Sequence, residues 1–180
     1  RGYLIGSGWK EYQSSSSVCS IPLPSGMSLA QKLASPLYTP SSKAPAGEHD
    51  TNISFAETKL LVGENLANKI KEKSMEIYKF ATSHAISRGI IIADTKFEFG
   101  LDANNQLTLM DEVLTPDSSR FWPKAEYRAG TNPKSYDKQI IRDYLETLDW
   151  DKAPPAPILP NDILTKTAKK YEEVQALLCS

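Results

Sequence analysis

The sequence predicts an α+β fold, in which long helices pack against an antiparallel sheet. Residues 90–99 form an Ile- and Phe-rich run of the kind found in strands, and residues 107–113 form a second such run after a polar turn. Between residues 54 and 88, apolar residues instead recur at helical spacing. These two patterns predict a β-hairpin over residues 90–113 and a helical segment before it.

The N-terminal third of the chain shows little periodicity. Residues 1–12 are expected to form a strand that ends at the turn Gly6-Ser7-Gly8. Residues 13–53 are rich in Ser, Pro and Gly, and a loop of that length is usually either functional or disordered.

Helix boundaries are marked more clearly. Ser54 and Glu57 have the spacing of a capping box, Gly63 is expected to break the helix, and Gly89 is expected to end its longer continuation. The expected core stripe of this helix consists of Leu66, Ile70, Ile77, Tyr78, Ala81 and Ala85. Two further helices are expected over residues 135–148 and 161–178, joined by a proline-rich linker. We expect residues 1–150 to form one domain, with residues 151–180 as a linker and a helix that packs on it.

Composition narrows the class of protein. A chain of 180 residues fits one domain, and 21 basic against 22 acidic residues exclude a general nucleic-acid binder. No apolar run approaches the roughly 18 residues of a membrane span. The two distant cysteines form no disulfide framework, which is typical of a cytoplasmic protein. Because the chain begins at Arg1 inside an expected strand, we expect it to be part of a longer protein.

Charged residues alternate inside the first strand run. Asp94, Lys96 and Glu98 should share one face, because a strand alternates its faces. A hairpin centred between residues 104 and 105 would place Glu98 opposite Asp111. Two facing carboxylates repel unless a cation such as Mg²⁺ lies between them. The alternative is a solvated outer face, and a change of one residue in the turn would remove the pairing.

Six motifs in chain order resemble one family. They are Arg1-Gly2-Tyr3 with Gly6-Ser7, Tyr38-Thr39-Pro40-Ser41-Ser42-Lys43, Gly47-Glu48-His49-Asp50, Ala93-Asp94-Thr95-Lys96-Phe97-Glu98-Phe99-Gly100, Asp111 to Trp122, and Ser135-Tyr136-Asp137-Lys138-Gln139. In this order they resemble the SAICAR synthetases, the phosphoribosylaminoimidazole-succinocarboxamide synthases of purine biosynthesis. The resemblance is strong in residues 1–12, 36–54 and 88–144, and weak in residues 13–35 and after 148.

The resemblance implies an ATP-grasp-like C-terminal lobe of a ligase. Such an enzyme uses ATP with Mg²⁺ to join the carboxylate of carboxyaminoimidazole ribonucleotide to L-aspartate, giving SAICAR, ADP and phosphate. Family members carry a preceding N-terminal lobe that is absent here, so the chain by itself should lack a complete adenine pocket and be inactive. The alternative function is a non-catalytic module that binds nucleotides or phosphate.

The resemblance also assigns roles to the charged strand residues. Glu98 and Asp111 match the Mg²⁺-binding carboxylates and, with Lys96, the ATP-binding positions. Lys96 would stabilise the transferring phosphate as a catalytic residue, or form an ion pair with Asp94. Asp94, also assigned as catalytic, would orient that lysine or the amine of the aspartate substrate.

The remaining assignments concern substrate binding. Arg1, Ser7 and Arg120 resemble the positions that bind the 5′-phosphate of the ribonucleotide, and arginine suits phosphate because it binds it bidentately. Further substrate-site positions are Lys43, Asp50, Asp137, Lys138 and Arg142. The last three also fit a charge cluster on a helix surface. For His49, an orienting role is preferred to that of a catalytic base.

Overall fold

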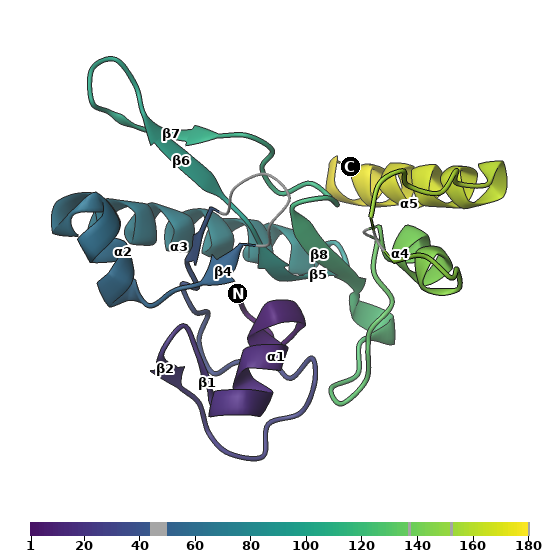
Figure 1. The fold of residues 1–180 in the computed structure, drawn as a ribbon, viewed down its shortest axis with the longest axis horizontal. Helices are drawn as coiled ribbons and strands as arrows, with labels where there is room; N and C mark the ends of the chain where they lie inside the picture. Colours follow the sequence, from purple (N-terminus) through teal and green to yellow (C-terminus); the bar gives the residue numbers. More distant parts are fainter. Residues whose placement is uncertain (44–49, 137, 152, 180) are drawn as a thin grey trace.

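The structure is a computed structural model that describes residues 1–43, 50–136, 138–151 and 153–179. Its elements, in chain order, are α1 (Gly6–Ser15), β1 (Ser17–Val18), β2 (Ile21–Pro22), β3 (Ser41–Ser42), β4 (Thr51–Asn52), α2 (Phe55–Val62), α3 (Glu64–Ser87), β5 (Ile90–Thr95), β6 (Glu98–Leu101), β7 (Leu107–Met110), β8 (Ser119–Pro123), a 3₁₀ turn η1 (Lys124–Glu126), α4 (Gln139–Glu146) and α5 (Asn161–Cys179). In Figure 1, α2 lies at one end of the molecule and the pair α4 and α5 at the other. The mixture of helices with small antiparallel sheets confirms the α+β class.

The predicted capping box and glycine stops are confirmed. The Ser54 side chain accepts a hydrogen bond from the Glu57 backbone N–H, and the Glu57 carboxylate accepts one from the Ser54 N–H. Gly63, with φ of 84°, separates α2 from α3, and Gly89, with φ of 75°, follows the end of α3. The residues of α3 that are buried are Ala67, Ser74, Tyr78, Ala81 and Ala85. The expected core stripe is therefore correct in its C-terminal half, whereas Leu66, Ile70 and Ile77 are only half-buried.

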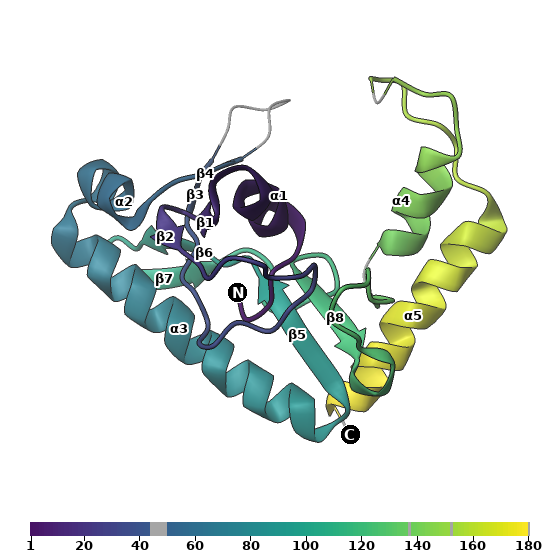
Figure 2. The ribbon, with the colours of Figure 1, turned by 90° about the horizontal axis from the view of Figure 1, so that it is seen from below.

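The central sheet consists of β5 and β8. They pair antiparallel, and the register shifts between Ile92 and Asp94, which leaves Ala93 as the extra residue of a β-bulge. Helix α3 packs along β5, as Figure 2 shows, and the Tyr78 hydroxyl donates a hydrogen bond of 2.7 Å to the Ile92 carbonyl. On the other face of the sheet, Trp122 is buried. These contacts hold the bulge between two hydrophobic clusters.

The prediction of one hairpin over residues 90–113 is wrong. The strand run is interrupted at residues 96–97, so that β5 pairs with β8 and only β6 pairs with β7. Glu98 lies opposite Met110, one position away from the predicted partner Asp111. The cause is the loop of residues 102–106, in which the Asp102 carboxylate accepts hydrogen bonds from two backbone N–H groups and Asn105 adopts φ of 59°. This five-residue loop shifts the register by one residue.

The predicted strand over residues 1–12 is also corrected. The first five residues are extended, and the Gly2 N–H donates a hydrogen bond of 2.9 Å to the Ala93 carbonyl of β5. The chain then turns directly into α1. The turn is made at Gly6, the first residue of the helix, whose φ of 61° is readily adopted by glycine. The segment of residues 13–53, expected as a loop, contains among its described residues the short antiparallel pairs β1–β2 and β3–β4.

The C-terminal region agrees in part with expectation. Helix α5 spans the predicted range, and its Val174 joins the core cluster of β5. Helix α4 is shorter than predicted and begins at Gln139 rather than Ser135. The Ser135 hydroxyl donates to the Phe121 carbonyl, which ties this segment to β8 instead of capping a helix. No helix in the described part of the chain is long and apolar enough to cross a membrane.

Candidate functional site

A cleft of about 790 Å³ lies where α1, α3, β5 and β8 meet the β3–β4 segment. Most of the predicted site residues contribute to its lining. They are Arg1, Ser7, Lys43, Asp50, Asp94, Lys96, Arg120 and Arg142. Residues separated by more than a hundred positions in the sequence are thus brought to one cavity, because the extended N-terminal segment runs beside β5.

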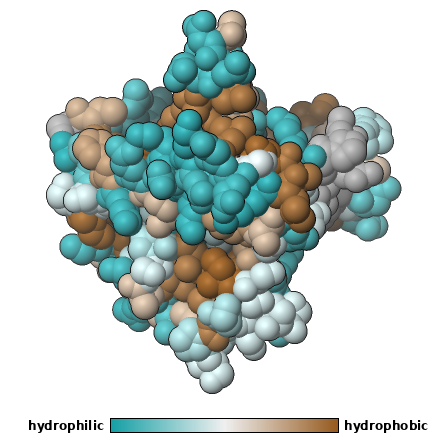
Figure 3. Space-filling model, turned by 90° about the vertical axis from the view of Figure 1, so that its left-hand side faces the viewer, coloured by the Kyte–Doolittle hydropathy of each residue, from teal (hydrophilic) through white to brown (hydrophobic). Residues whose placement is uncertain are grey.

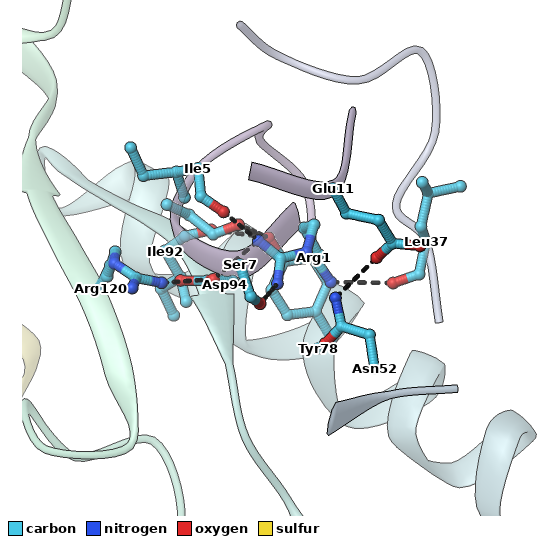
Figure 4. A network of polar contacts seen from close by, with 11 residues as sticks. Arg1, Ile5, Ser7, Glu11, Leu37, Asn52, Tyr78, Ile92, Asp94 and Arg120 are labelled. Atoms are coloured by element: carbon cyan, nitrogen blue, oxygen red, sulfur yellow. Dashed lines mark hydrogen bonds and ion pairs between the residues drawn. The ribbon is translucent and has the colours of Figure 1, made fainter. Parts of the chain in front are cut away.

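Asp94 holds two arginines together at the inner end of this cleft (Figure 4). Its Oδ2 accepts hydrogen bonds from Arg1 Nη1 at 3.0 Å and from Arg120 Nη1 at 2.6 Å. The side chains of Arg1, Asp94 and Arg120 are 8%, 12% and 29% exposed. The bulge in β5 places Asp94 directly across from Arg120 in the ladder. The alternative ion pair between Asp94 and Lys96 is wrong, since the structure pairs Asp94 with the two arginines and Lys96 with Glu98.

The position of Arg1 is set by several contacts. Arg1 Nη1 also donates to the Ile5 carbonyl at 2.6 Å, and Nη2 donates to Ser7 Oγ at 3.4 Å. Its α-nitrogen donates to the Leu37 carbonyl at 2.9 Å. Its Nε is buried and has no hydrogen-bond partner among the described residues. The guanidinium is therefore held next to an exposed Ser7, which lies in the first turn of α1 and not in the turn after a strand that the sequence predicted.

Glu98 joins two lysines at the outer end of the cleft. Its Oε1 accepts from Lys96 Nζ at 2.9 Å and its Oε2 from Lys43 Nζ at 3.1 Å. These bonds, first that from Lys96 and then that from Lys43, hold the pKa of Glu98 below its ordinary value. The pKa of Lys96 is raised, chiefly by its bond to Glu98, with smaller contributions from the charges of Asp50 and Asp111. The outer cluster, Glu98 with Lys96 and Lys43, thus consists of charges that act on one another.

The predicted metal pair Glu98 and Asp111 is not formed by cross-strand pairing. Asp111 follows β7 and adopts φ of 61°, a conformation that aspartate tolerates better than most residues. Within the part of the chain that the structure describes, no group of three or more His, Cys, Asp or Glu side chains could hold a metal ion.

The rim near α4 and α5 contains two residues that the sequence reasoning did not single out. The Tyr171 hydroxyl of α5 donates to Asp117 Oδ1 at 3.0 Å, and Lys138 Nζ lies 3.5 Å from the same oxygen. Asp117 lines the cleft, whereas Lys138 reaches the cleft only through this contact. The sequence signal that could have identified Asp117 is its position within the Asp111–Trp122 motif. Asp137 and His49 lie outside the described residues.

Apolar side chains form the remaining wall of the cleft. Leu61, Val62, Phe97 and Phe99 contribute to the lining, and Leu61 is 68% exposed. Figure 3 shows hydrophobic areas on the face of the molecule that carries α2 and the β6–β7 hairpin. The cleft thus combines a cationic inner end with an apolar wall.

Comparison with known proteins identifies the family. The family model described as SAICAR synthetase matches residues 1–157. The phosphoribosylaminoimidazole-succinocarboxamide synthase of a Polaromonas species is 60% identical over 96% of this chain, and that of Neisseria meningitidis serogroup C is 57% identical over 99%. The chain spans 60% and 62% of those two relatives.

Solved structures lead to the same family. The SAICAR synthase of Saccharomyces cerevisiae in complex with SAICAR matches all of this chain with a TM-score of 0.88 and 43% identity, and 58% of its own length is covered. The SAICAR synthetase of Pyrococcus horikoshii has the same fold, with a TM-score of 0.67 at 24% identity. From the family model, the relatives and the shared fold, the chain belongs to the SAICAR synthetase family.

Proposed function

We propose that this chain provides the ribonucleotide-binding and much of the catalytic part of an ATP-dependent ligase that forms SAICAR. The enzyme would join the carboxylate of carboxyaminoimidazole ribonucleotide to the amino group of L-aspartate, with release of ADP and phosphate. The observation that carries the proposal is the convergence of Arg1, Ser7 and Arg120 in one cleft. It is supported by the 43% identical yeast relative, whose structure contains SAICAR.

The inner end of the cleft is suited to a phosphate monoester. Arg1 and Arg120 bring two positive charges and Asp94 brings one negative charge, so the cluster keeps a net charge of +1 for an anion. Arginine binds phosphate oxygens bidentately, and the Ser7 hydroxyl lies beside it at the first turn of α1, where the helix dipole also favours an anion. We assign the 5′-phosphate of the ribonucleotide to this position.

The outer cluster is suited to the transferring phosphate of ATP. Lys96 and Lys43 carry positive charge where it can stabilise negative charge that develops during phosphoryl transfer. Their side chains are 51% and 80% exposed, so both can turn from Glu98 toward a ligand. Lys96 is therefore proposed as a catalytic residue, and Asp94 as the residue that orients the two arginines.

Mg²⁺ is the metal that this donor set fits. Glu98 and Asp111 offer hard oxygen ligands, and Mg²⁺ usually takes one or two carboxylates together with substrate phosphates. Glu98 is ionised, and its two oxygens accept hydrogen bonds from Lys43 and Lys96, which a cation could replace. When bound, Mg²⁺ would supply charge neutralisation at the ATP phosphates. Asp50, Asp137, Lys138 and Arg142 remain proposed substrate-binding residues.

The rest of the enzyme is proposed from the relatives. The curated relatives extend well beyond the matched part, and we propose that an N-terminal lobe completes an ATP-grasp-like nucleotide site over the apolar wall. Formation of ADP that requires both L-aspartate and the carboxylated ribonucleotide would establish the reaction. ADP formation without either one, or binding without turnover by the full-length protein, would contradict it.

Arg120→Ala tests the phosphate assignment in the full-length protein. It should weaken ribonucleotide binding by about 2–4 kcal/mol, because a charge-assisted contact is lost and the phosphate is left underpaired. ATP affinity should change little. Arg128→Ala is the matched control, since Arg128 is exposed and outside the cleft lining. Separate calorimetric titrations of both ligands decide the matter, and equal weakening for both would mean that the pocket is misassigned.

A further inference from the structure

We propose that Gly8 is a positioning residue for Arg1, because the absence of a side chain at Gly8 lets the Arg1 guanidinium lie against the first turn of α1. The proposal rests on the proposed function, in that the guanidinium is taken to bind the phosphate of the ribonucleotide.

The contact between Gly8 and Arg1 is closer than any side chain would allow. A Cβ at residue 8 would lie 2.9 Å from Arg1 Cζ and 3.0 Å from both Nε and Nη1. Gly8 is buried, and the Arg1 side chain is only 8% exposed. Arg1 Nη1 is also bonded to Asp94 and to the Ile5 carbonyl, so a guanidinium that shifts by a few tenths of an ångström away from a new methyl group would lengthen these bonds.

The second arginine has the same kind of contact on the same turn. A Cβ at Gly6 would lie 2.6 Å from Arg120 Nη2 and 2.9 Å from Cζ. Gly6 and Gly8 flank Ser7 in the sequence. The guanidinium of Arg120 lies against Gly6 and that of Arg1 against Gly8 (Figure 4 shows both arginines and Ser7). Gly6 adopts φ of 61°, which by itself favours glycine, so it is not a clean test position.

Helix propensity argues against glycine at residue 8. Glycine inside a helix destabilises it relative to alanine, and Gly8 has no left-handed backbone that would require glycine. The local helix would therefore favour alanine. The close approach of the guanidinium supplies the reason for glycine, which is the placement of Arg1 rather than the stability of α1.

The experiment compares Gly8→Ala with wild type in the full-length protein. SAICAR and its dephosphorylated nucleoside are titrated by calorimetry, and urea unfolding is measured in parallel. Wild type should bind SAICAR more tightly than the nucleoside. Gly8→Ala should lower SAICAR affinity at least about tenfold and leave nucleoside affinity unchanged, since only the phosphate contact is displaced. Gly26→Ala is the control. Its φ of 76° makes alanine strained there, so it should lose stability in urea, but no atom lies within 4 Å of its added Cβ, so it should bind both ligands as wild type does.

A second variant keeps the test decisive if Gly8→Ala folds poorly. Alanine at residue 1 lacks the Cζ, Nε and Nη1 atoms that meet the new Cβ, so Arg1→Ala with Gly8→Ala should bind SAICAR as Arg1→Ala alone does. Unchanged SAICAR affinity in Gly8→Ala, equal losses for both ligands, or additive losses in the double variant would overturn the role of Gly8. Equal affinity of wild type for SAICAR and its nucleoside would instead overturn the phosphate assignment itself.

Discussion

Replacing Asp94 by asparagine should uncouple the two arginines at the inner end of the cleft. In the structure one oxygen, Asp94 Oδ2, accepts from both Arg1 and Arg120. Asparagine keeps the shape and one carbonyl oxygen but removes the negative charge. The substitution therefore tests whether charge, rather than packing, holds this cluster in place.

The expected loss of folding stability comes from the two hydrogen bonds to Asp94, whose arginine partners are buried to different extents. Each bond keeps its charged guanidinium donor and loses the negative charge of its acceptor. Because charge-assisted bonds between two ionised groups are roughly twice as strong as neutral ones, each bond should lose about 1 kcal/mol. The Arg1 side chain, at 8% exposed, is also left without a counter-charge, whereas Arg120, at 29% exposed, is partly screened by water. The free energy of unfolding should fall by about 2–4 kcal/mol in total.

Urea unfolding of the full-length protein measures this loss. Asp162→Asn is the matched control, because Asp162 pairs with Lys166 on α5 and both side chains are more than half exposed. The control should lose less than about 0.5 kcal/mol. Inorganic phosphate should stabilise Asp94→Asn more than wild type, because it replaces the missing negative charge between the guanidiniums. A loss no larger than that of the control, or an equal effect of phosphate on both proteins, would refute the reasoning.

Two further predictions concern the outer cluster and the core. Glu98→Gln should lower turnover by orders of magnitude and shift the Mg²⁺ dependence to higher concentration, and wild-type metal dependence would exclude Glu98 as a ligand. The pKa of Glu98 lies below its ordinary 4.5, so its ion pairs should stabilise the protein above pH 4.5. This stabilisation should be lost as the pH falls through the lowered pKa. Glu98→Gln should remove this pH dependence from acid unfolding curves. Tyr78→Phe should cost about 1–3 kcal/mol in urea unfolding, because the Ile92 carbonyl loses a buried donor; an unchanged midpoint would show that the carbonyl finds another partner.

Local sequence signals predicted the boundaries of α2 and α3 well. The capping box at Ser54, the break at Gly63 and the stop at Gly89 each depend on neighbours within a few residues, so they could be read without knowledge of the fold. The register of the β6–β7 hairpin could not, because its five-residue loop, closed by bonds to the Asp102 carboxylate, is centred on residue 104 and not between residues 104 and 105. The alternation of apolar and polar residues along the strands does not by itself distinguish these two positions of the turn.

The sequence by itself determined which residue types are available for the site: arginines and a serine near glycines, and lysines beside carboxylates. It also determined the family, because the motifs recur in a specific order. Which of these charges meet was decided only by the tertiary structure. The bulge at Ala93 aligns Asp94 with Arg120, and the N-terminal segment beside β5 brings Arg1 to the same carboxylate. Such pairings join positions far apart in the chain, so they depend on how strands and helices pack and not on local propensity.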